Sequence, residues 1–324
     1  MSRVNALWAV PGAILVSVIG LIHSKSEVPT RSDWARAVQQ VRGELKPDDG
    51  VTWAPYWAGE GRLFFHDLPA FGAPPDDLDG YHRYRRVWRL SAFGQHHEGQ
   101  TEHTVEARWQ FGGVTLELLT TTQPRSVASL YDDLPAVTVR RMRPTRTEQC
   151  GFWDGRGWHC ASPSNFDRIR DCLTEGTPAR LRRFRQRKDP HCGLNPWLNV
   201  SRDHRVIGRY PRRCVWLHPV AGAETQVRWR PKARGQTLHL RFGFADKAVQ
   251  YFQGKMPRTK PLTLKVVSDN HPPSEFVVEP SPGWKSETID LPSDLTEIIL
   301  SVSTSATVDA HFCLEADIRR GETP

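Results

Sequence analysis

The sequence lacks the short motifs by which several enzyme classes are recognised. It has no C-x-x-C pair for dithiol redox chemistry, no G-x-S-x-G nucleophile elbow, no P-loop and no G-x-G-x-x-G fingerprint. The stretch HHEGQTEH, residues 96–103, lacks the i, i+4 histidine spacing of a zinc protease and is expected to be a solvated helix face. We therefore expect no metal and no cofactor, and the sequence does not specify a reaction.

Long apolar runs are also scarce, and the single one lies in the first 25 residues. Arg3 precedes the uncharged stretch VNALWAVPGAILVSVIGLI, which ends at Ile22. Signal peptides carry roughly 7 to 15 apolar residues and spanning helices roughly 17 to 25. No clear A-x-A cleavage pattern follows, which favours an uncleaved signal anchor over a removed signal peptide at residues 1–25. We expect one N-terminal membrane helix in the inner membrane, with the rest of the chain on the periplasmic, extracytoplasmic side.

The six cysteines are an even number, as expected of an exported chain in an oxidising compartment. Their nearest spacing, in CGFWDGRGWHC, is too wide for the close pairs that are typical of zinc sites. Disulfides are therefore favoured, while free structural thiols and metal or redox chemistry stay open. The cysteines are Cys150, Cys160, Cys172, Cys192, Cys214 and Cys313.

Residues 30–145 show helical and extended patterns in alternation, which is typical of an α/β layered domain. Trp34, Val38 and Val41 recur at helical spacing and predict a helix over 32–45, capped by Ser32 or Asp33. Further helices are expected at 96–108 and 126–134. Strands are expected at 51–54, 86–92, 114–120 and 137–142.

Residues 212–320 change to the period of two that is typical of strands. In TLHLRFGF the apolar residues alternate with polar residues or glycine, and TVDAHFCLEADIR repeats the pattern up to Ile318. Similar shorter patterns occur around Val227, Leu264 and Leu300. Alternating strands separated by Gly/Pro turns predict an all-β antiparallel sandwich of the jelly-roll type.

Two stretches resemble known families. The segment DWARAVQQVRGELKPDDGVTWAPYW, followed by YHRYRRVWRLSAFG and FGGVTLELL, resembles the soluble α/β region of bacterial lipid-linked-sugar glycosyltransferases. No catalytic residue of that family has a counterpart here, so transferase activity does not carry over. RRCVWLHPVAGAETQVRWRPKARGQTLHLRFGFAD through GWKSETIDLPSDLTEIILSVSTSATVDAHFCLEADI is similar to jelly rolls of the galactose-binding-like type, and the whole chain resembles bacterial envelope proteins.

The jelly-roll resemblance implies a disulfide pattern. In such sandwiches the first and last strands are neighbours, which would bring Cys214 and Cys313 together on the face opposite the apolar one. The other expected pairs are Cys150 with Cys160 and Cys172 with Cys192, although six cysteines allow fifteen connectivities.

A basic, cysteine-bearing connector is expected at 146–211, between the two domains. Residues 178–213 hold eleven basic and two acidic residues, a net charge of +9, whereas the whole chain carries +8. Arginine forks match phosphate and carboxylate oxygens, so the expected partners are anionic lipid head groups of the membrane, lipid-linked sugar phosphates or acidic polysaccharide, but not nucleic acid. A solvated charged loop is the alternative. The candidate anion-binding residues are Arg180, Arg182, Arg183, Arg185, Arg187 and Lys188.

Twelve tryptophans suggest a further binding chemistry, because aromatic faces stack on sugar rings and exposed tryptophan is a common way to hold a neutral glycan. Core packing is the alternative for each of them. We interpret the chain as an anchored glycan- or lipid-linked-glycan-binding accessory of envelope polysaccharide assembly, with an envelope glycosyltransferase as a further partner. A glycan hydrolase or transferase and a structural scaffold remain alternatives. The candidates for glycan contact are Trp53, Tyr56, Trp57, Trp153 and Trp158.

Overall fold

The chain folds into two compact units, residues 1–124 and residues 125–324. The expected anchor at 1–25 lies outside the described residues. Among those described, no helix is long and apolar enough to cross a membrane. The computed structural model describes residues 28–46, 49–55, 57–58, 60, 64, 81–95, 103–121, 126–160, 199–208, 210–249, 259–269, 271–305 and 311–320.

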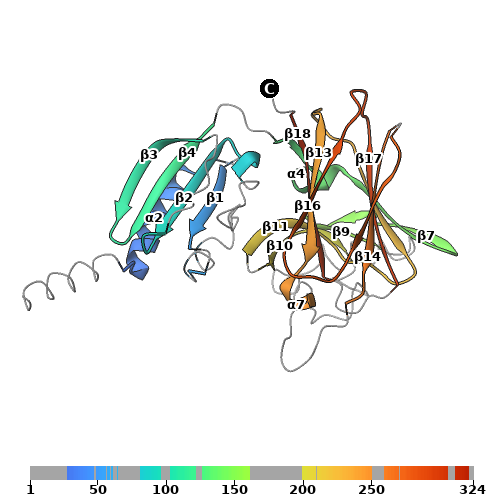
Figure 1. The fold of residues 1–324 in the computed structure, drawn as a ribbon, viewed down its shortest axis with the longest axis horizontal. Helices are drawn as coiled ribbons and strands as arrows, with labels where there is room; N and C mark the ends of the chain where they lie inside the picture. The colour runs from blue at the N-terminus through green and yellow to red at the C-terminus, as the bar shows by residue number, and fades with distance from the viewer. Residues whose placement is uncertain are drawn as a thin grey trace, which may run out of the picture. The chain divides into compact units, whose positions relative to one another are not determined.

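The first unit packs one helix, α2 (Arg31–Glu44), against a four-stranded sheet (Figure 1). A short 3-10 turn, η1 (Tyr81–Arg83), precedes the second strand. In order across the sheet, the strands are β1 (Asp49–Ala54), β2 (Arg86–Ala92), β4 (Val114–Thr120) and β3 (Thr104–Phe111). β1 runs parallel to β2, whereas the other neighbours are antiparallel. The predicted helix at 32–45 and the strands at 51–54, 86–92 and 114–120 are present.

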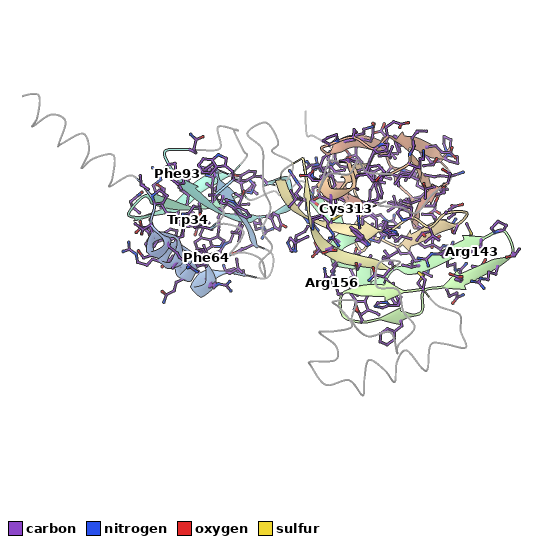
Figure 2. The ribbon with its side chains drawn as sticks, turned by 90° about the horizontal axis from the view of Figure 1, so that it is seen from below. Trp34, Phe64, Phe93, Arg143, Arg156 and Cys313 are labelled. Carbon is purple, nitrogen blue, oxygen red and sulfur yellow. A yellow bond between two sulfur atoms is a disulfide. The ribbon has the colours of Figure 1, made fainter. Side chains whose placement is uncertain are left out.

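Helix α2 begins at a capping box centred on Thr30. The Thr30 hydroxyl accepts a hydrogen bond from the Asp33 backbone N–H at 3.2 Å, and the Asp33 carboxylate accepts from the Thr30 N–H at 2.9 Å. The cap is therefore Thr30 rather than Ser32 or Asp33, because Asp33 occupies the third helical position. The predicted apolar stripe of the helix, which includes Trp34, is buried against the sheet (Figure 2).

The helix expected at 96–108 is wrong where the structure describes it, since residues from Thr104 onward form β3. Gly112 and Gly113 join β3 to β4 in a two-residue turn, and Gly112 has a left-handed φ of 55°. Trp109 of β3 stacks on Trp88 of β2 at 5.7 Å between ring centroids. Pairing with β4 and this aromatic contact stabilise a strand where the local pattern predicted a helix. In its described part, the first unit therefore alternates between helix and strand less than expected.

The second unit is a β-sandwich of two antiparallel sheets (Figure 1). The eight-stranded sheet contains, in order, β16 (Lys285–Asp290), β13 (Thr237–Phe244), β18 (Phe312–Arg319), β11 (Tyr210–Leu217), β10 (Val200–Ile207), β9 (Gly157–His159) and β8 (Phe152–Trp153), with β5 (Ser126–Ser129) beside β18. The six-stranded sheet contains β15 (Ser274–Val278), β14 (Leu262–Ser268), β17 (Ile298–Thr304), β12 (Glu224–Trp229), β6 (Thr138–Arg143) and β7 (Arg146–Gln149). The short helices α4 (Leu130–Asp133), η2 (Leu134–Ala136) and α7 (Asp246–Val249) complete the unit.

The predicted apolar faces line the space between the two sheets. In β13 and β18, every second residue enters one hydrophobic cluster, and the same holds for β12, β14 and β17. Because successive side chains of a strand point to opposite faces, this core fixes the register of both sheets. The prediction of an antiparallel sandwich is confirmed. The buried residues of β13 and β18 are Leu238, Leu240, Phe242, Phe244, Phe312, Leu314, Ala316 and Ile318.

The sandwich also takes strands from before residue 212. Residues 126–134, expected as one helix, form β5 followed by the short α4, and β6 pairs with β12. The first compact unit therefore ends at Pro124, upstream of the boundary expected near 145. The connector expected at 146–211 contributes β7 to β10, since β10 pairs with β11 and β7 with β6. Residues 161–198 lie outside the described part of the chain.

Two of the three expected disulfides are present. Cys150 bonds to Cys160, and Cys214 bonds to Cys313 with 5.6 Å between their Cα atoms. β11 and β18 are neighbours, and both cysteines of the second bond lie on the outer face of the eight-stranded sheet, opposite the core, as expected (Figure 2). The expected pair of Cys172 and Cys192 lies outside the described residues.

The first disulfide closes the β8–β9 hairpin, whose turn is organised by Asp154. Asp154 Oδ1 accepts hydrogen bonds from the backbone N–H groups of Arg156 at 2.8 Å and Gly157 at 2.7 Å, and Oδ2 lies 3.0 Å from His159 Nε2. Burial raises the pKa of the Asp154 carboxyl, but its contacts with His159 and the two N–H groups outweigh burial and lower the pKa to about 2. Cys150–Cys160 is thus a covalent staple on a hydrogen-bonded turn.

The two disulfides should stabilise the fold unequally. Cys214 and Cys313 are separated by 99 residues, whereas Cys150 and Cys160 are separated by 10. Since a longer loop loses more entropy on closure, we expect the double variant Cys214→Ala/Cys313→Ala to lose about 4 to 5 kcal/mol of unfolding free energy and Cys150→Ala/Cys160→Ala about 3 kcal/mol. Denaturant unfolding of both variants measures this. A larger loss from the short loop would contradict the entropic account.

The lowered pKa of Asp154 gives a pH dependence of stability. A carboxyl whose pKa is lower in the folded chain than in the unfolded chain stabilises the fold. This effect is fully present when the pH is well above the usual pKa of 3.8, and it is lost as the pH falls toward 2. We expect Asp154→Asn to cost roughly 2 kcal/mol of unfolding free energy at pH 7 and about half of that near pH 3. Denaturant unfolding at both pH values, with the exposed Asp290→Asn as control, measures it. An equal cost at both values would show that the carboxylate charge is not responsible.

Candidate functional site

The aromatic candidates of the first unit differ in exposure. Trp53 is 2% exposed and belongs to the core beneath α2, so it is a packing residue. Tyr56 lies outside the described residues. Trp57 is 61% exposed and lies against Phe93 (labelled in Figure 2), with 5.4 Å between the ring centroids. Trp57 therefore remains available for stacking.

The two tryptophans of the β8–β9 hairpin serve the sandwich itself. Trp153 and Trp158 are partly buried against its core, with 5.5 Å between their ring centroids. The Trp158 indole N–H donates to the Leu134 carbonyl at 2.8 Å, and the Arg202 guanidinium lies 5.9 Å from the Trp153 ring. These contacts are with the sandwich itself, and glycan contact by the two partly buried tryptophans stays a prediction. The basic candidates between residues 180 and 188 lie outside the described residues.

A row of side chains crosses the outer face of the six-stranded sheet. Strand register places one residue from each strand in line, so that each stands directly opposite the next. All of them lie on the face opposite the hydrophobic core. From β7 to β15, the row consists of Thr147, Met142, Glu224, Ser303, Thr263 and Val277.

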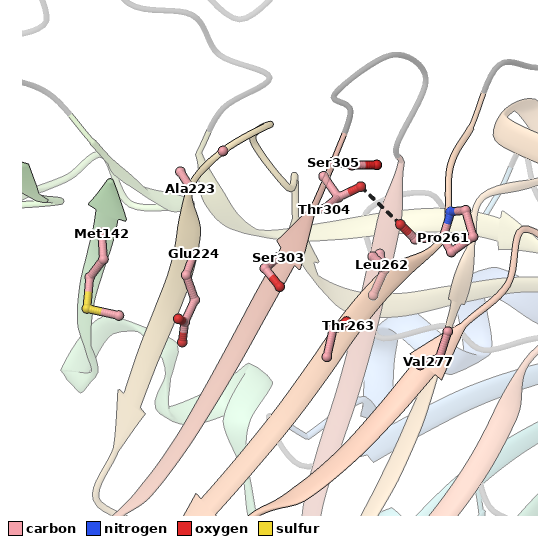
Figure 3. Close-up of a pocket in the computed structure, with 11 residues that line it drawn as sticks. Met142, Ala223, Glu224, Pro261, Leu262, Thr263, Val277, Ser303, Thr304 and Ser305 are labelled. Carbon is pink, nitrogen blue, oxygen red and sulfur yellow. Dashed lines mark hydrogen bonds between the residues drawn. The ribbon is translucent and has the colours of Figure 1, made fainter. Parts of the chain in front are cut away.

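The five residues of this row from Met142 to Val277 line a hollow of about 320 Å³ (Figure 3). Gly222 and Pro261 also line the hollow, and the Thr304 hydroxyl donates to the Pro261 carbonyl at 3.1 Å, as the dashed line in Figure 3 marks. Gly222 has a φ of 66°, which a residue with a side chain adopts only with strain. The hollow is at the lower end of the size range of small-ligand sites.

The lining of the hollow combines hydrogen-bonding groups with apolar ends. Ser303 and Thr263 carry hydroxyls that both donate and accept, while the Glu224 carboxylate accepts, and one of its oxygens is held by the Gln226 amide at 3.0 Å. Met142 lies at one end of the lining, and Val277, 66% exposed, lies at the other. Such an arrangement can bind a polyhydroxylated ring by its hydroxyls and its C–H face.

Glu224 is the one carboxylate in the described lining of the hollow, whereas most glycosidases use two carboxylates. Across the described residues, no group of three His, Cys, Asp or Glu side chains is placed to hold a metal ion.

The row was not found from the sequence. Glu224, Thr263 and Ser303 are the polar members of alternating strands whose apolar members predicted the core. Alternation shows that these residues share an outer face within each strand. It does not show which residue of one strand stands opposite which residue of the next, and that register creates the row.

No protein-family model matches the chain, and no curated protein sequence matches it. Among solved structures, the chain is similar to CBM51-2 in complex with GlcNAc and INT domains from Clostridium perfringens ZmpB, at 11% identity and a TM-score of 0.26, over 37% of this chain and 25% of that one. The chain thus spans about a quarter of that structure's length.

It is also similar to CBM51 from Clostridium perfringens GH95 in complex with methyl-galactose, at 9% identity and a TM-score of 0.25, over 37% of this chain and 71% of that one. A family 35 carbohydrate binding module from Clostridium thermocellum has 9% identity and a TM-score of 0.20, over 30% of this chain and 78% of that one. The expected resemblance of the first unit to lipid-linked-sugar glycosyltransferases has no support in these matches. The three structures named here are described as carbohydrate-binding modules or contain one.

Proposed function

We propose that this protein binds glycans through the row of side chains on the outer face of its six-stranded sheet. The observation that carries the proposal is the register that aligns Glu224, Ser303 and Thr263 in one open hollow. The hydroxyl groups of a sugar need both donors and acceptors, and these three residues supply them side by side. The hollow accommodates one sugar of the glycan, and its open side leaves room for the neighbouring sugars.

The location that we propose is extracytoplasmic, with residues 1–25 as an inner-membrane anchor. Support comes from the apolar stretch after Arg3 and from the Cys150–Cys160 and Cys214–Cys313 disulfides, because such bonds persist in oxidising compartments. In that location the natural ligands are envelope polysaccharides or lipid-linked glycans, and the protein acts as an accessory to their assembly beside an envelope glycosyltransferase. The basic residues between 180 and 188 would add attraction to anionic lipid head groups or sugar phosphates.

The binding site is tested by changing the carboxylate acceptor. We expect Glu224→Gln to weaken binding of the full-length protein to its best glycan on an envelope-glycan array about tenfold, since one charge-assisted hydrogen bond is lost. Glu287→Gln, which makes the same change at an exposed position on β16 of the other sheet, is the control and should bind like the unchanged protein. Equal affinity of the Glu224→Gln variant and the control would contradict glycan binding in the hollow.

The proposed location is tested separately. We expect a reporter that is active only outside the cytoplasm to be active when fused after residue 30 and when fused after residue 324, because Arg3 favours the cytoplasmic side for the N-terminus. Fractionation of the same cells shows whether the fusions remain in the membrane. Cytoplasmic activity of either fusion would overturn the proposed location.

A further inference from the structure

A second row crosses the same outer face next to the hollow, and it contains an arginine that has no partner among the described residues. Arg140 of β6 stands between Gln149 of β7 and Gln226 of β12. Its side chain is half-buried, and its Nε is buried without a hydrogen-bond partner. Within the described part of the chain, the Arg140 guanidinium also makes no ion pair. Burying a charged donor without an acceptor is unfavourable, so a ligand that supplies one would be stabilised there.

The other basic side chains of this face are neutralised by carboxylates. Lys265, which belongs to the same row, lies 2.9 Å from Glu275. In the next row, the Nε of Arg228 donates to Glu297 at 3.0 Å, and Arg230 beyond the strand end reaches the same carboxylate at 3.1 Å. Among the described residues of this face, Arg140 is therefore the basic side chain that lacks a carboxylate partner, and an external anion could supply one.

Arg140 lies close enough to the hollow for one bound glycan to contact both. It precedes Met142 by two residues on β6, and strand geometry places such positions roughly 7 Å apart on one face. Glu224 and Gln226 have the same relation on the neighbouring strand β12, and the Gln226 amide holds Glu224. A sugar whose hydroxyls meet Glu224 and Ser303 can thus direct a substituent of its own, or of the adjoining sugar, toward Arg140.

We infer that Arg140 selects glycans that carry a uronic acid carboxylate. This inference rests on the proposed glycan-binding function of the hollow. The planar guanidinium fork matches a carboxylate with two parallel hydrogen bonds, and a carboxylate would supply the ionic partner that the half-buried Arg140 lacks among the described residues. The hydroxyl-binding row and the arginine together form a site for an acidic sugar, with the ring over the hollow and its carboxylate at the second row.

The test compares one glycan with and without its charge. The probes are oligogalacturonate and its fully methyl-esterified form, measured by calorimetry with the full-length protein. We expect the unchanged protein to prefer the acid form about 10- to 100-fold, the range of a charge-assisted contact, and to lose this preference as salt is added. Arg140→Gln should abolish the preference while leaving affinity for the ester form unchanged.

Two further variants control for general charge and for geometry. Arg230→Gln removes a positive charge from the same sheet at an exposed residue that already has a carboxylate partner, and it should keep the preference. Arg140→Lys keeps the charge without the fork and should retain part of the preference.

The two proposals fail in different ways. Equal binding of the acid and ester forms by the unchanged protein, or an unchanged preference in the Arg140→Gln variant, would overturn the role of Arg140 and leave glycan binding in place. Absence of binding to either form, together with no binding on the glycan array, would overturn the proposed function itself.

Discussion

The structure of the second unit depends on the alternation of side chains along its strands. The strands that form the core must place their apolar residues between the sheets, because this burial is the main favourable term in folding. A slip of one residue in any strand would expose that set to water. The inner face therefore dictates the register of β6, β12, β14, β15 and β17 in the smaller sheet, and the register in turn determines what stands side by side on the outer face.

The residues of the outer face do not form the core, so their side chains can serve binding. Residues such as Glu224, Ser303 and Arg140 contribute nothing to the hydrophobic cluster, yet their positions are as well determined as those of the core residues beside them. A rigid sheet can thus present hydrogen-bonding groups in fixed lines at little cost in conformational entropy. The Cys214–Cys313 bond on the outer face of the opposite sheet and the Cys150–Cys160 staple reinforce the same frame.

The sequence predicted those features that follow from local pattern. Helix α2 and strand β2 follow directly from their apolar spacing, and Leu238 to Phe244 predicted a sandwich strand correctly. The helix expected at 96–108 failed because β3 is specified by its partner β4 and by the Trp88–Trp109 contact, which no local pattern shows. The strands β8 to β10 are short or polar, and successive pairing of β10 with β11, β9 with β10 and β8 with β9 defines them. The candidate site has the same origin, since its residues come from strands far apart in the chain.

The central claim is that the outer face of the six-stranded sheet holds the sugar. The most direct measurement is a crystal structure of the protein with a bound uronic acid oligosaccharide. The account expects the sugar ring over Glu224, Ser303 and Thr263, with its carboxylate within hydrogen-bonding distance of the Arg140 guanidinium. A sugar stacked instead on Trp57 and Phe93, with the hollow empty, would contradict it.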